Sequence, residues 1–281
     1  MATSSTTWRA VLVDAVEQVG EVDARRLVEQ AAGYDGAELV LHLDETPTQR
    51  AMAYFDGMLA RRRAGEPLQY VLGRWGFRTL DLVVDPRVLI PRPETEEVAG
   101  AAIAEARRLG ARVVADLGTG SGAIALSMAV ELPGVEVWAS DVSADALEVA
   151  RANLAGIGRA GTRVRLVQGS WFDALPADLR GRIDVVAANP PYVPATAQLP
   201  PDVADWEPGV ALYGGDDGTV EPFKVIDAAP GWLRRPGALV MEHGAWMGEA
   251  MVARALAAGF DDATFHHDLT HRERYLVARL T

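Results

Sequence analysis

A rigid polar and aromatic segment, Asn189-Pro190-Pro191-Tyr192, directly follows the apolar residues VVAA at 185–188. Its two prolines donate no backbone hydrogen bonds and hold the chain extended, which fixes the direction of the Pro190 carbonyl. That carbonyl and the side-chain oxygen of Asn189 can accept the two hydrogens of a planar NH2 group, while Tyr192 lies against its flat face. We predict that Asn189, Pro190 and Tyr192 are catalytic. The predicted substrate-binding residues are Asn189, Pro190, Pro191 and Tyr192. The alternative is a rigid loop with an asparagine cap.

A planar amino or amide nitrogen is a poor nucleophile because its lone pair is delocalised. Acceptors that draw its two hydrogens aim the remaining electron density at an electrophile and stabilise the positive charge that develops on the nitrogen. Holding the reactants in position adds a further rate enhancement. The segment thus restricts the acceptor to adenine, cytosine, guanine or a glutamine amide. No charged general base is required, because the proton can leave to solvent.

A glycine-rich turn, DLGTGSG at 116–122, leaves another apolar run and enters the predicted helix AIALSMAVEL. Glycine lets the backbone turn tightly and lets a ligand approach the chain, and the N-terminus of the helix favours polar or anionic groups. The spacing G-x-G-x-G differs from the G-x-G-x-x-G fingerprint of dinucleotide sites, so a nicotinamide enzyme is the weaker alternative. The predicted cofactor-binding residues of this turn are Asp116, Gly118, Thr119, Gly120, Ser121 and Gly122.

Two more side chains, Asp141 and Trp171, stand where the following apolar runs end. A carboxylate at the end of the next strand can accept both hydroxyls of a ribose, and an aromatic face at the end of the third strand can stack on a base. Asp141 is alternatively the cap of the helix that follows, although Ser143 is an equally good cap. Trp171 is alternatively a core residue. With Asn189, these two residues complete the predicted cofactor site.

These candidate residues lie at the ends of short apolar runs that alternate with helical segments from Glu94 onward. The runs are at 112–118, 135–141, 164–170, 183–190 and 238–244. Such alternation is typical of a parallel sheet with helices on both faces. The tail, FDDATFHHD followed by RERYLVARL, lacks a helix-length spacer and predicts an antiparallel pair at one sheet edge. The predicted fold class is therefore α/β with a seven-stranded, mostly parallel sheet.

The first part of the chain is predicted to be a small helical bundle. Apolar residues recur at helical spacing in WRAVLVDAVEQVG, which ends at Gly20, and a second helix ends at Gly33. Thr46 before Pro47 predicts the start of another helix, because a capping residue followed by proline is typical of a helix N-terminus. We expect three regions: a helical domain at 1–72, a β-hairpin and linker at 73–93, and the cofactor-binding domain at 94–281.

The composition limits the class of protein. The chain has 281 residues and a formal net charge of −12, which argues against a broad electrostatic grip on nucleic acid. It has no cysteine, so disulfides, thiolate metal sites and cysteine nucleophiles are excluded. No other metal site is predicted. We expect neither a signal peptide nor a membrane span. A monomer in the cytoplasm, without direct contact to nucleic acid, is the expectation.

The glycine-rich turn, the strand-end acid and the strand-end aromatic residue resemble those of the class I S-adenosylmethionine-dependent methyltransferases, which have a Rossmann-like sheet. The resemblance implies that S-adenosyl-L-methionine is bound by 118–122, Asp141 and Trp171 and leaves as S-adenosyl-L-homocysteine. Over nearly the whole chain, the segments EPLQYVLGRWGF, VLIPRPETE, NPPY, EPGVALYGGDDG and MEHG are similar to the release factor glutamine methyltransferases, the HemK/PrmC family.

This second resemblance implies transfer of a methyl group to the side-chain amide nitrogen (N5) of the glutamine in the GGQ loop of class I peptide chain release factors. It also implies that 189–192 binds that glutamine, that Asn189 touches both cofactor and substrate, and that the N-terminal helical domain helps to dock the release factor. An rRNA or DNA amino-methyltransferase is the alternative enzyme, and an inactive S-adenosylmethionine-binding protein is the non-enzymatic alternative. Met247 and the ending HRERYLVARL depart from the family pattern.

Two further groups of residues allow more than one interpretation. Arg92, Glu94 and Thr95 either line the mouth of the cofactor site or, for the last two, cap the helix that begins near 95. The basic run at 61–63 is either a solvated helix end or a contact for the release factor or ribosomal RNA.

Overall fold

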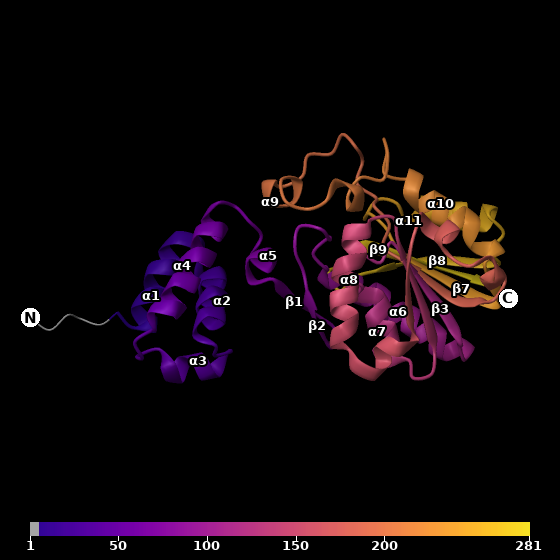
Figure 1. Cartoon of the computed structure of the whole chain (residues 1–281). Coiled ribbons are helices and arrows are strands. Elements are labelled where there is room, and N and C mark those ends of the chain that lie inside the picture. The colour runs from indigo at the N-terminus through magenta and orange to yellow at the C-terminus, as the bar shows by residue number, and fades with distance from the viewer. Residues whose placement is uncertain (1–5) are drawn as a thin grey trace, which may run out of the picture. The chain divides into compact units, whose positions relative to one another are not determined.

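The computed structural model describes residues 6–281 and divides into two compact units (Figure 1). The first unit runs to Gly73 and also includes Pro200–Trp206. This short segment belongs to the long insertion that follows the NPPY segment, and the Trp206 indole nitrogen lies near Gly65. The second unit contains Arg74–Leu199 and Glu207–Thr281. The sequence did not indicate that part of the insertion would join the helical unit.

The helices of the first unit begin and end at identifiable caps. Gly20, with φ of 84°, separates α1 from α2, and α2 ends at Gly33 in the left-handed conformation, as the sequence predicted. The side chain of Thr48 accepts a hydrogen bond from the Ala51 N–H at 3.1 Å and begins α4, so the predicted start at Thr46 is wrong. The helices are α1 (Trp8–Val19), α2 (Glu21–Ala32), α3 (Ala37–His42), α4 (Gln49–Arg63), α5 (Leu68–Leu72) and α9 (Pro201–Ala204).

The core of the first unit lies between α1, α2 and α4. Trp8 and Phe55 are buried there, and their rings meet edge to face with centroids 6.5 Å apart. Two arginines of the basic run also make contacts within this unit: Arg61 is paired with Glu66, and Arg62 Nε lies 2.6 Å from an oxygen of Asp23. Both side chains therefore help to hold α4 against its neighbours.

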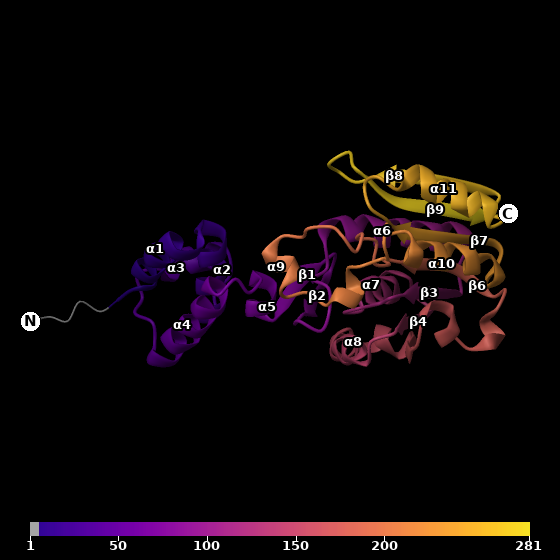
Figure 2. The same cartoon turned by 90° about the horizontal axis from the view of Figure 1, so that it is seen from above.

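The second unit contains a two-stranded hairpin and a seven-stranded sheet in the order β5-β4-β3-β6-β7-β9-β8 (Figure 2). β3 to β7 run parallel, whereas β9 is antiparallel to both β7 and β8. The predicted α/β fold with an antiparallel C-terminal pair is confirmed. The strands are β1 (Arg74–Phe77), β2 (Leu80–Val83), β3 (Val113–Leu117), β4 (Glu136–Asp141), β5 (Val164–Gln168), β6 (Ile183–Ala188), β7 (Leu233–Glu242), β8 (Asp262–His267) and β9 (Glu273–Leu280).

Strand β6 illustrates why these residues form a doubly covered sheet. All six of its residues are buried, as expected of a parallel strand with helices on both faces. Val186 and Ala188 lie in one hydrophobic cluster with Val225 of α10 and Met251 of α11. Because side chains alternate along a strand, the intervening residues face the opposite side, where Figure 1 shows α6, α7 and α8.

The helices of the second unit cover this sheet. They are α6 (Pro93–Leu109), α7 (Ala123–Glu131), α8 (Ala144–Gly156), α10 (Val220–Ala228) and α11 (Gly248–Ala257), with a short 3₁₀ helix at Trp171–Ala174. No helix within residues 6–281 has both the length and the apolar character needed to cross a membrane.

The ends of the parallel strands bring the candidate residues to one edge of the sheet. The glycine-rich turn follows β3, and Asp141 is the last residue of β4. Asn189 follows β6, and Glu242 is the last residue of β7. Neighbouring parallel strands end at the same edge, which is where ligands bind in open α/β sheets.

Candidate active site

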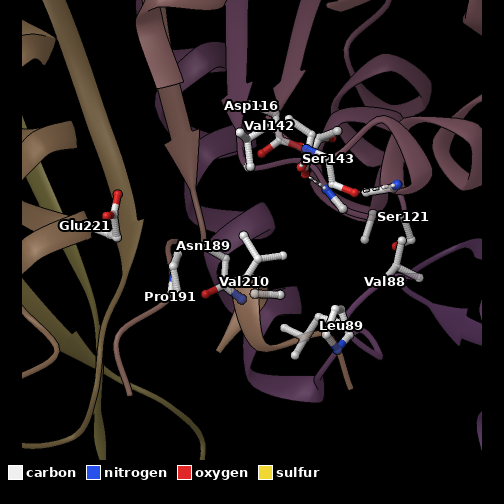
Figure 3. Close-up of a pocket in the computed structure, with 18 of the residues that line it drawn as sticks. Val88, Leu89, Asp116, Ser121, Val142, Ser143, Asn189, Pro191, Val210 and Glu221 are labelled. Atoms are coloured by element: carbon white, nitrogen blue, oxygen red, sulfur yellow. Dashed lines mark hydrogen bonds between the residues drawn. The ribbon is translucent and has the colours of Figure 1, made fainter. Parts of the chain in front are cut away.

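A cavity of about 370 Å³ lies at this edge of the second unit (Figure 3). That volume is in the range of small-molecule sites. The predicted residues that line it are Asp116, Gly118, Thr119, Gly120, Ser121, Asp141, Trp171, Asn189 and Pro191. Gly122, Pro190 and Tyr192 are not among the lining residues. Apolar side chains that the sequence did not single out, among them Val88, Val142 and Val210, form part of the wall.

The glycine-rich turn is tied to the end of β4. The backbone N–H groups of Gly118 and Thr119 both donate to the carbonyl of Ser140 at 2.9 Å. Gly118 has φ of +73°, and a Cβ at this position would lie 3.0 Å from Cζ3 of Trp171. Glycine is therefore required here for both the backbone conformation and the close approach of the indole.

Asp116 is a buried carboxyl group at the floor of the cavity. Its Oδ2 accepts hydrogen bonds from the Thr119 hydroxyl at 2.6 Å and from the Ala125 N–H at 3.0 Å, whereas its Oδ1 is buried without a hydrogen-bond donor. Burial raises the pKa of Asp116 to about 7, although the two hydrogen bonds favour the carboxylate. A buried polar atom without a partner is uncommon, so a ligand that brings an N–H or O–H donor to this oxygen fits the site.

Asp141 uses both carboxylate oxygens to hold the backbone. Oδ2 accepts from the Gly120 N–H at 2.8 Å, and Oδ1 accepts from the Ser143 N–H at 2.9 Å. The side chain that caps α8 is Ser143, which accepts from the Ala146 N–H at 3.1 Å. Burial raises the pKa of Asp141, opposed by these backbone hydrogen bonds. Each oxygen keeps a second acceptor position, which can receive a ribose hydroxyl.

Trp171 lies between the cavity and the core. It has φ of 46°, and its indole N–H donates to Oε2 of Glu221 on α10 at 2.9 Å. The ring lies over Gly118 and lines the cavity while it also packs against the hydrophobic cluster of α10 and α11. The sequence offered two interpretations of Trp171, an aromatic surface at the cofactor site and a core residue. The position of the ring is compatible with both. Glu221, which the sequence did not identify, fixes the ring.

Asn189 faces the cavity with a defined orientation of its carboxamide. Its Nδ2 donates to the hydroxyl oxygen of Thr95 at 3.3 Å. Its Oδ1 receives no hydrogen bond from the residues that the structure describes, and Figure 3 places Asn189 beside Pro191 at the cavity wall. The carbonyl end of the side chain is thus available to accept a hydrogen from a ligand.

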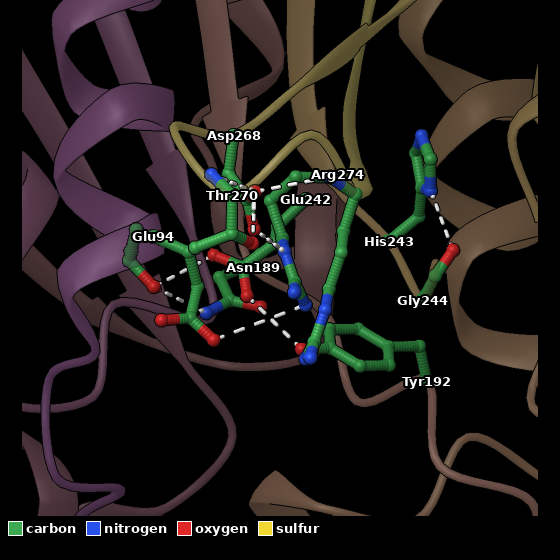
Figure 4. A network of polar contacts seen from close by, with 11 residues as sticks. Glu94, Asn189, Tyr192, Glu242, His243, Gly244, Asp268, Thr270 and Arg274 are labelled. Atoms are coloured by element: carbon green, nitrogen blue, oxygen red, sulfur yellow. Dashed lines mark hydrogen bonds and ion pairs between the residues drawn. The ribbon is translucent and has the colours of Figure 1, made fainter. Parts of the chain in front are cut away.

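Tyr192 is turned toward the interior of the protein. Its hydroxyl donates to Oε1 of Glu242 at 3.1 Å (Figure 4). Burial raises the pKa of Tyr192 far above its usual value, so the hydroxyl stays protonated. Tyr192 therefore anchors the NPPY segment through its hydroxyl. The contact of its ring with a planar acceptor stays a prediction.

A second segment clamps the backbone on the C-terminal side of the NPPY sequence. The Val193 N–H donates to the Leu212 carbonyl, and the Gly214 N–H donates to the Val193 carbonyl, both at 2.9 Å. A Cβ at Gly214 would lie 2.3 Å from the Pro191 carbonyl oxygen, and a Cβ at Gly218 would lie 2.1 Å from that of Tyr192. The glycines of YGGDDG thus permit a contact that side chains would exclude.

Arg92, which precedes α6, and the first turn of this helix contribute charged and polar partners. Thr95 is buried and donates its hydroxyl to Oε2 of Glu242 at 2.6 Å. Arg92 pairs with the buried Glu207, and Glu94 lies 3.8 Å from Arg274. Of the three residues left open by the sequence, only Thr95 lines the cavity. No sequence pattern predicted that Thr95 would pair with Glu242 of β7.

Two family models match the chain. Residues 6–73 match the PrmC N-terminal domain, and residues 102–203 match the methyltransferase small domain. The solved N-terminal domain of human METTL16 in complex with SAH is similar in fold, with a TM-score of 0.52 and 17% identity, and the match covers 78% of this chain and 82% of that one.

Curated relatives extend the match to nearly the full length. A protein from Bifidobacterium longum named release factor glutamine methyltransferase is 42% identical, and the match covers 92% of each chain. A protein of the same name from Xylella fastidiosa is 39% identical, with 96% of this chain and 97% of that protein covered.

Proposed function

This chain belongs to the release factor glutamine methyltransferase family, and on that premise we propose that it methylates class I peptide chain release factors. The methyl group of S-adenosyl-L-methionine is transferred to the side-chain amide nitrogen (N5) of the glutamine in the GGQ loop, with S-adenosyl-L-homocysteine as the second product. The named relatives, each matched over most of its own length, support this substrate. They do not favour the alternative, an rRNA or DNA amino-methyltransferase.

One observation in the site supports a planar NH2 group as the acceptor most directly. Asn189 lines the cavity, and its Nδ2 is already engaged by Thr95. The carboxamide oxygen is consequently the end that remains for the substrate, and an oxygen is what an NH2 group needs. The Pro190 carbonyl would accept the second hydrogen. With both hydrogens held, the acceptor nitrogen is oriented toward the electrophile.

The cavity residues also fit the proposed cofactor. The unpartnered Oδ1 of Asp116 would receive an N–H donor such as the ammonium of the amino-acid end. Asp141 would accept the ribose hydroxyls, while Trp171 and Val142 offer apolar surface to the base. The bound cofactor supplies a methyl group activated by its sulfonium sulfur. The protein holds the cofactor and the acceptor in line.

The chain's own residues need no charged base for the transfer. When the N–C bond forms, the nitrogen becomes positively charged and both of its hydrogens become more acidic. The oxygens of Asn189 and Pro190 stabilise this charge, and one proton then leaves to solvent. The product amide keeps only one N–H, so it makes one hydrogen bond fewer to the oxygens of Asn189 and Pro190. This loss favours product release.

We further propose a role for each domain, a monomeric state and a cytoplasmic location. The helical domain at 1–72 docks the release factor, the segment at 73–93 connects it, and 94–281 carries the methyltransferase site. A protein substrate and the net charge of −12 fit an enzyme without direct contact to nucleic acid. Since release factors act on cytoplasmic ribosomes, we place the enzyme in the cytoplasm, and we propose that it is a monomer.

A labelling experiment tests this function. The protein is incubated with methyl-labelled S-adenosylmethionine and either a purified class I release factor or rRNA. Label on the GGQ glutamine, located by peptide mass spectrometry, is the expected result. A release factor whose GGQ glutamine is replaced by alanine is the matched control and should stay unlabelled. Label on rRNA alone would reject the proposal, and no label on either would favour a protein that only binds the cofactor.

A further inference from the structure

Glu242 is a carboxyl group buried behind the cavity that the proposed transfer does not use. It is the last residue of β7, has no exposed surface, and does not line the cavity. Its two oxygens accept hydrogen bonds from two different segments: Oε2 from the Thr95 hydroxyl at 2.6 Å and Oε1 from the Tyr192 hydroxyl at 3.1 Å. Figure 4 shows this group in one polar network with Asn189, Tyr192 and Arg274.

Glu242, Thr95 and Asn189 form a hydrogen-bonded chain. In this chain, the group that donates in one hydrogen bond determines the direction of the next. An ionised carboxylate can only accept, so the single hydrogen of the Thr95 hydroxyl is donated to Glu242. The oxygen of Thr95 is then left as an acceptor, and it receives a hydrogen from Nδ2 of Asn189 at 3.3 Å. The carboxamide of Asn189 is thereby held with its oxygen available to the acceptor substrate.

We propose that Glu242 and Thr95 are positioning residues that decide which end of the Asn189 carboxamide meets the acceptor nitrogen. This inference rests on the proposed function, because it concerns the acceptor site of that reaction. If the carboxamide were reversed, its NH2 group would face the NH2 group of the substrate, and two donors would oppose each other. The hydrogen-bond chain removes this unproductive arrangement before the substrate binds.

The charge on Glu242 is the element that imposes the direction. A neutral carboxyl group can donate as well as accept, so the Thr95 hydroxyl would be released to donate to Asn189. Glu242 is faced by Thr95 and Glu94 of α6, by Tyr192 of the NPPY segment and by Arg274 of β9. Burial raises the pKa of Glu242 to about 7, opposed by the hydrogen bonds from Thr95 and Tyr192. Deprotonation therefore takes place near neutral pH.

A merely structural role for these residues would have different consequences. Loss of packing or of a buried hydrogen bond would lower stability and affect cofactor binding and turnover alike. Loss of orientation at Asn189 would lower kcat while the dissociation constant of the cofactor stays nearly unchanged. The two roles are therefore distinguished by the ratio of these effects.

The variants are chosen to separate size, hydrogen bonding and charge. Thr95→Val keeps the volume but removes the hydroxyl, and Thr95→Ser restores it. Glu242→Gln keeps the shape but removes the charge. Two controls lose a hydroxyl or a charge away from the cavity: Thr162→Val removes an exposed hydroxyl that donates to the Arg159 carbonyl, and Glu105→Gln neutralises a buried carboxylate paired with arginines.

Turnover of the full-length protein is measured with a release factor at saturating cofactor, beside cofactor affinity and melting temperature. We expect Thr95→Val to lower kcat about 30-fold and to change cofactor affinity less than about threefold, a cost comparable with loss of one oriented polar contact. Thr95→Ser should recover kcat to within about threefold of the original. The double variant with Glu242→Gln should be no slower than Thr95→Val alone, because both changes break one chain. Both controls should retain kcat.

The pH dependence provides a second test. In the original protein kcat should rise as the pH increases through about 7 and Glu242 loses its proton. Glu242→Gln should lack this rise, and its kcat should equal the low-pH plateau of the original protein at every pH. An unchanged rise in Glu242→Gln would overturn the role of the charge. Equal losses of kcat and cofactor affinity in Thr95→Val, or no recovery in Thr95→Ser, would overturn the role of the hydroxyl.

A readout without substrate keeps this inference separate from the proposed function. Hydrogen exchange of the Asn189 side-chain amide, followed by NMR on the cofactor-bound protein, should be slow in the original protein and in Thr95→Ser. It should be fast in Thr95→Val and faster than the original in Glu242→Gln. If the release factor is not methylated, the proposed function fails, but these exchange rates still decide whether the chain orients Asn189. Equal rates in all variants would refute it.

Discussion

The α-carbon of Gly218 lies so close to Tyr192 that a Cβ at this position would be 2.1 Å from the carbonyl oxygen of Tyr192. Gly218 lies shortly before α10, and Tyr192 is the last residue of the NPPY segment that follows β6. This close packing restricts the backbone of the NPPY segment at Tyr192, while Asn189 lines the cavity. The rigidity of the segment therefore comes from a packed neighbour as well as from its prolines.

Replacing Gly218 with alanine should displace the segment. We expect Gly218→Ala to lower kcat at least about tenfold, with a lower melting temperature, because backbone atoms cannot give way to the new Cβ. Gly181→Ala is the matched control: Gly181 also has positive φ, but no atom lies within 4 Å of its Cβ position, so it should show only the backbone strain of about 1 kcal/mol. Denaturant unfolding and steady-state turnover measure the two effects. Similar turnover in the two variants would contradict the clamp.

Removing the Asn189 side chain should affect the reaction far more than cofactor binding. We expect Asn189→Ala to lower kcat about 100-fold or more, since one of the two oriented acceptors is lost. The dissociation constant of the cofactor, measured by calorimetry, should change less than about fivefold. Equal losses in kcat and affinity would argue against a role in orienting the acceptor.

Asp116 should reduce stability while it supports cofactor binding. Its pKa is raised by burial from 3.8 to about 7, so the folded protein binds a proton that the unfolded chain has already lost between these values. Stability therefore falls as the pH rises from about 4 to about 7. At pH 8 Asp116→Asn should raise the free energy of unfolding by about 2 kcal/mol or more, and at pH 4 by much less.

Asp116→Asn should also bind the cofactor at least about tenfold more weakly. The reason is that an NH2 group replaces one carboxylate oxygen and the negative charge is lost, so the donor on the cofactor loses its acceptor. Denaturant titrations of the cofactor-free protein at the two pH values, together with calorimetric binding, provide the measurements. A variant that binds the cofactor normally would remove Asp116 from the site.

The indole of Trp171 should contribute to the cofactor pocket through its position over Gly118. We expect Trp171→Ala to weaken cofactor binding about tenfold, as base stacking on an aromatic ring contributes on the order of 1 kcal/mol or more. Glu221→Gln keeps a side-chain oxygen that can accept from the indole, so its effect should be less than about threefold. Fluorescence titration of the cofactor can test both. An alanine variant with unchanged affinity would assign Trp171 to the core alone.

Local sequence was sufficient for most of the fold and for the gathering of candidate residues at one edge of the sheet. The apolar runs predicted the central strands of the large sheet because these strands bury most of their residues, and in Ile183–Ala188 all six are buried. The glycine-rich turn, Asp141 and Asn189 were found because parallel strands end at one edge, whatever lies between them. The start of α4 was wrong by two residues, since Thr46 and Thr48 both flank Pro47 and only the folded chain selects the cap.

Only the tertiary structure decided which groups act on these residues. Thr95 and Glu242 are 147 positions apart, so no local sequence pattern contains their contact, and the close approach of Gly218 to Tyr192 appears only in the folded insertion. The orientation of the Asn189 carboxamide, the anchoring of Trp171 by Glu221 and the unpartnered oxygen of Asp116 have the same origin. Periodicity and motifs indicate the local structure that residues close in the sequence adopt. Hydrogen-bond partners and buried charges depend on distances through space, which exist only after the strands and helices have packed.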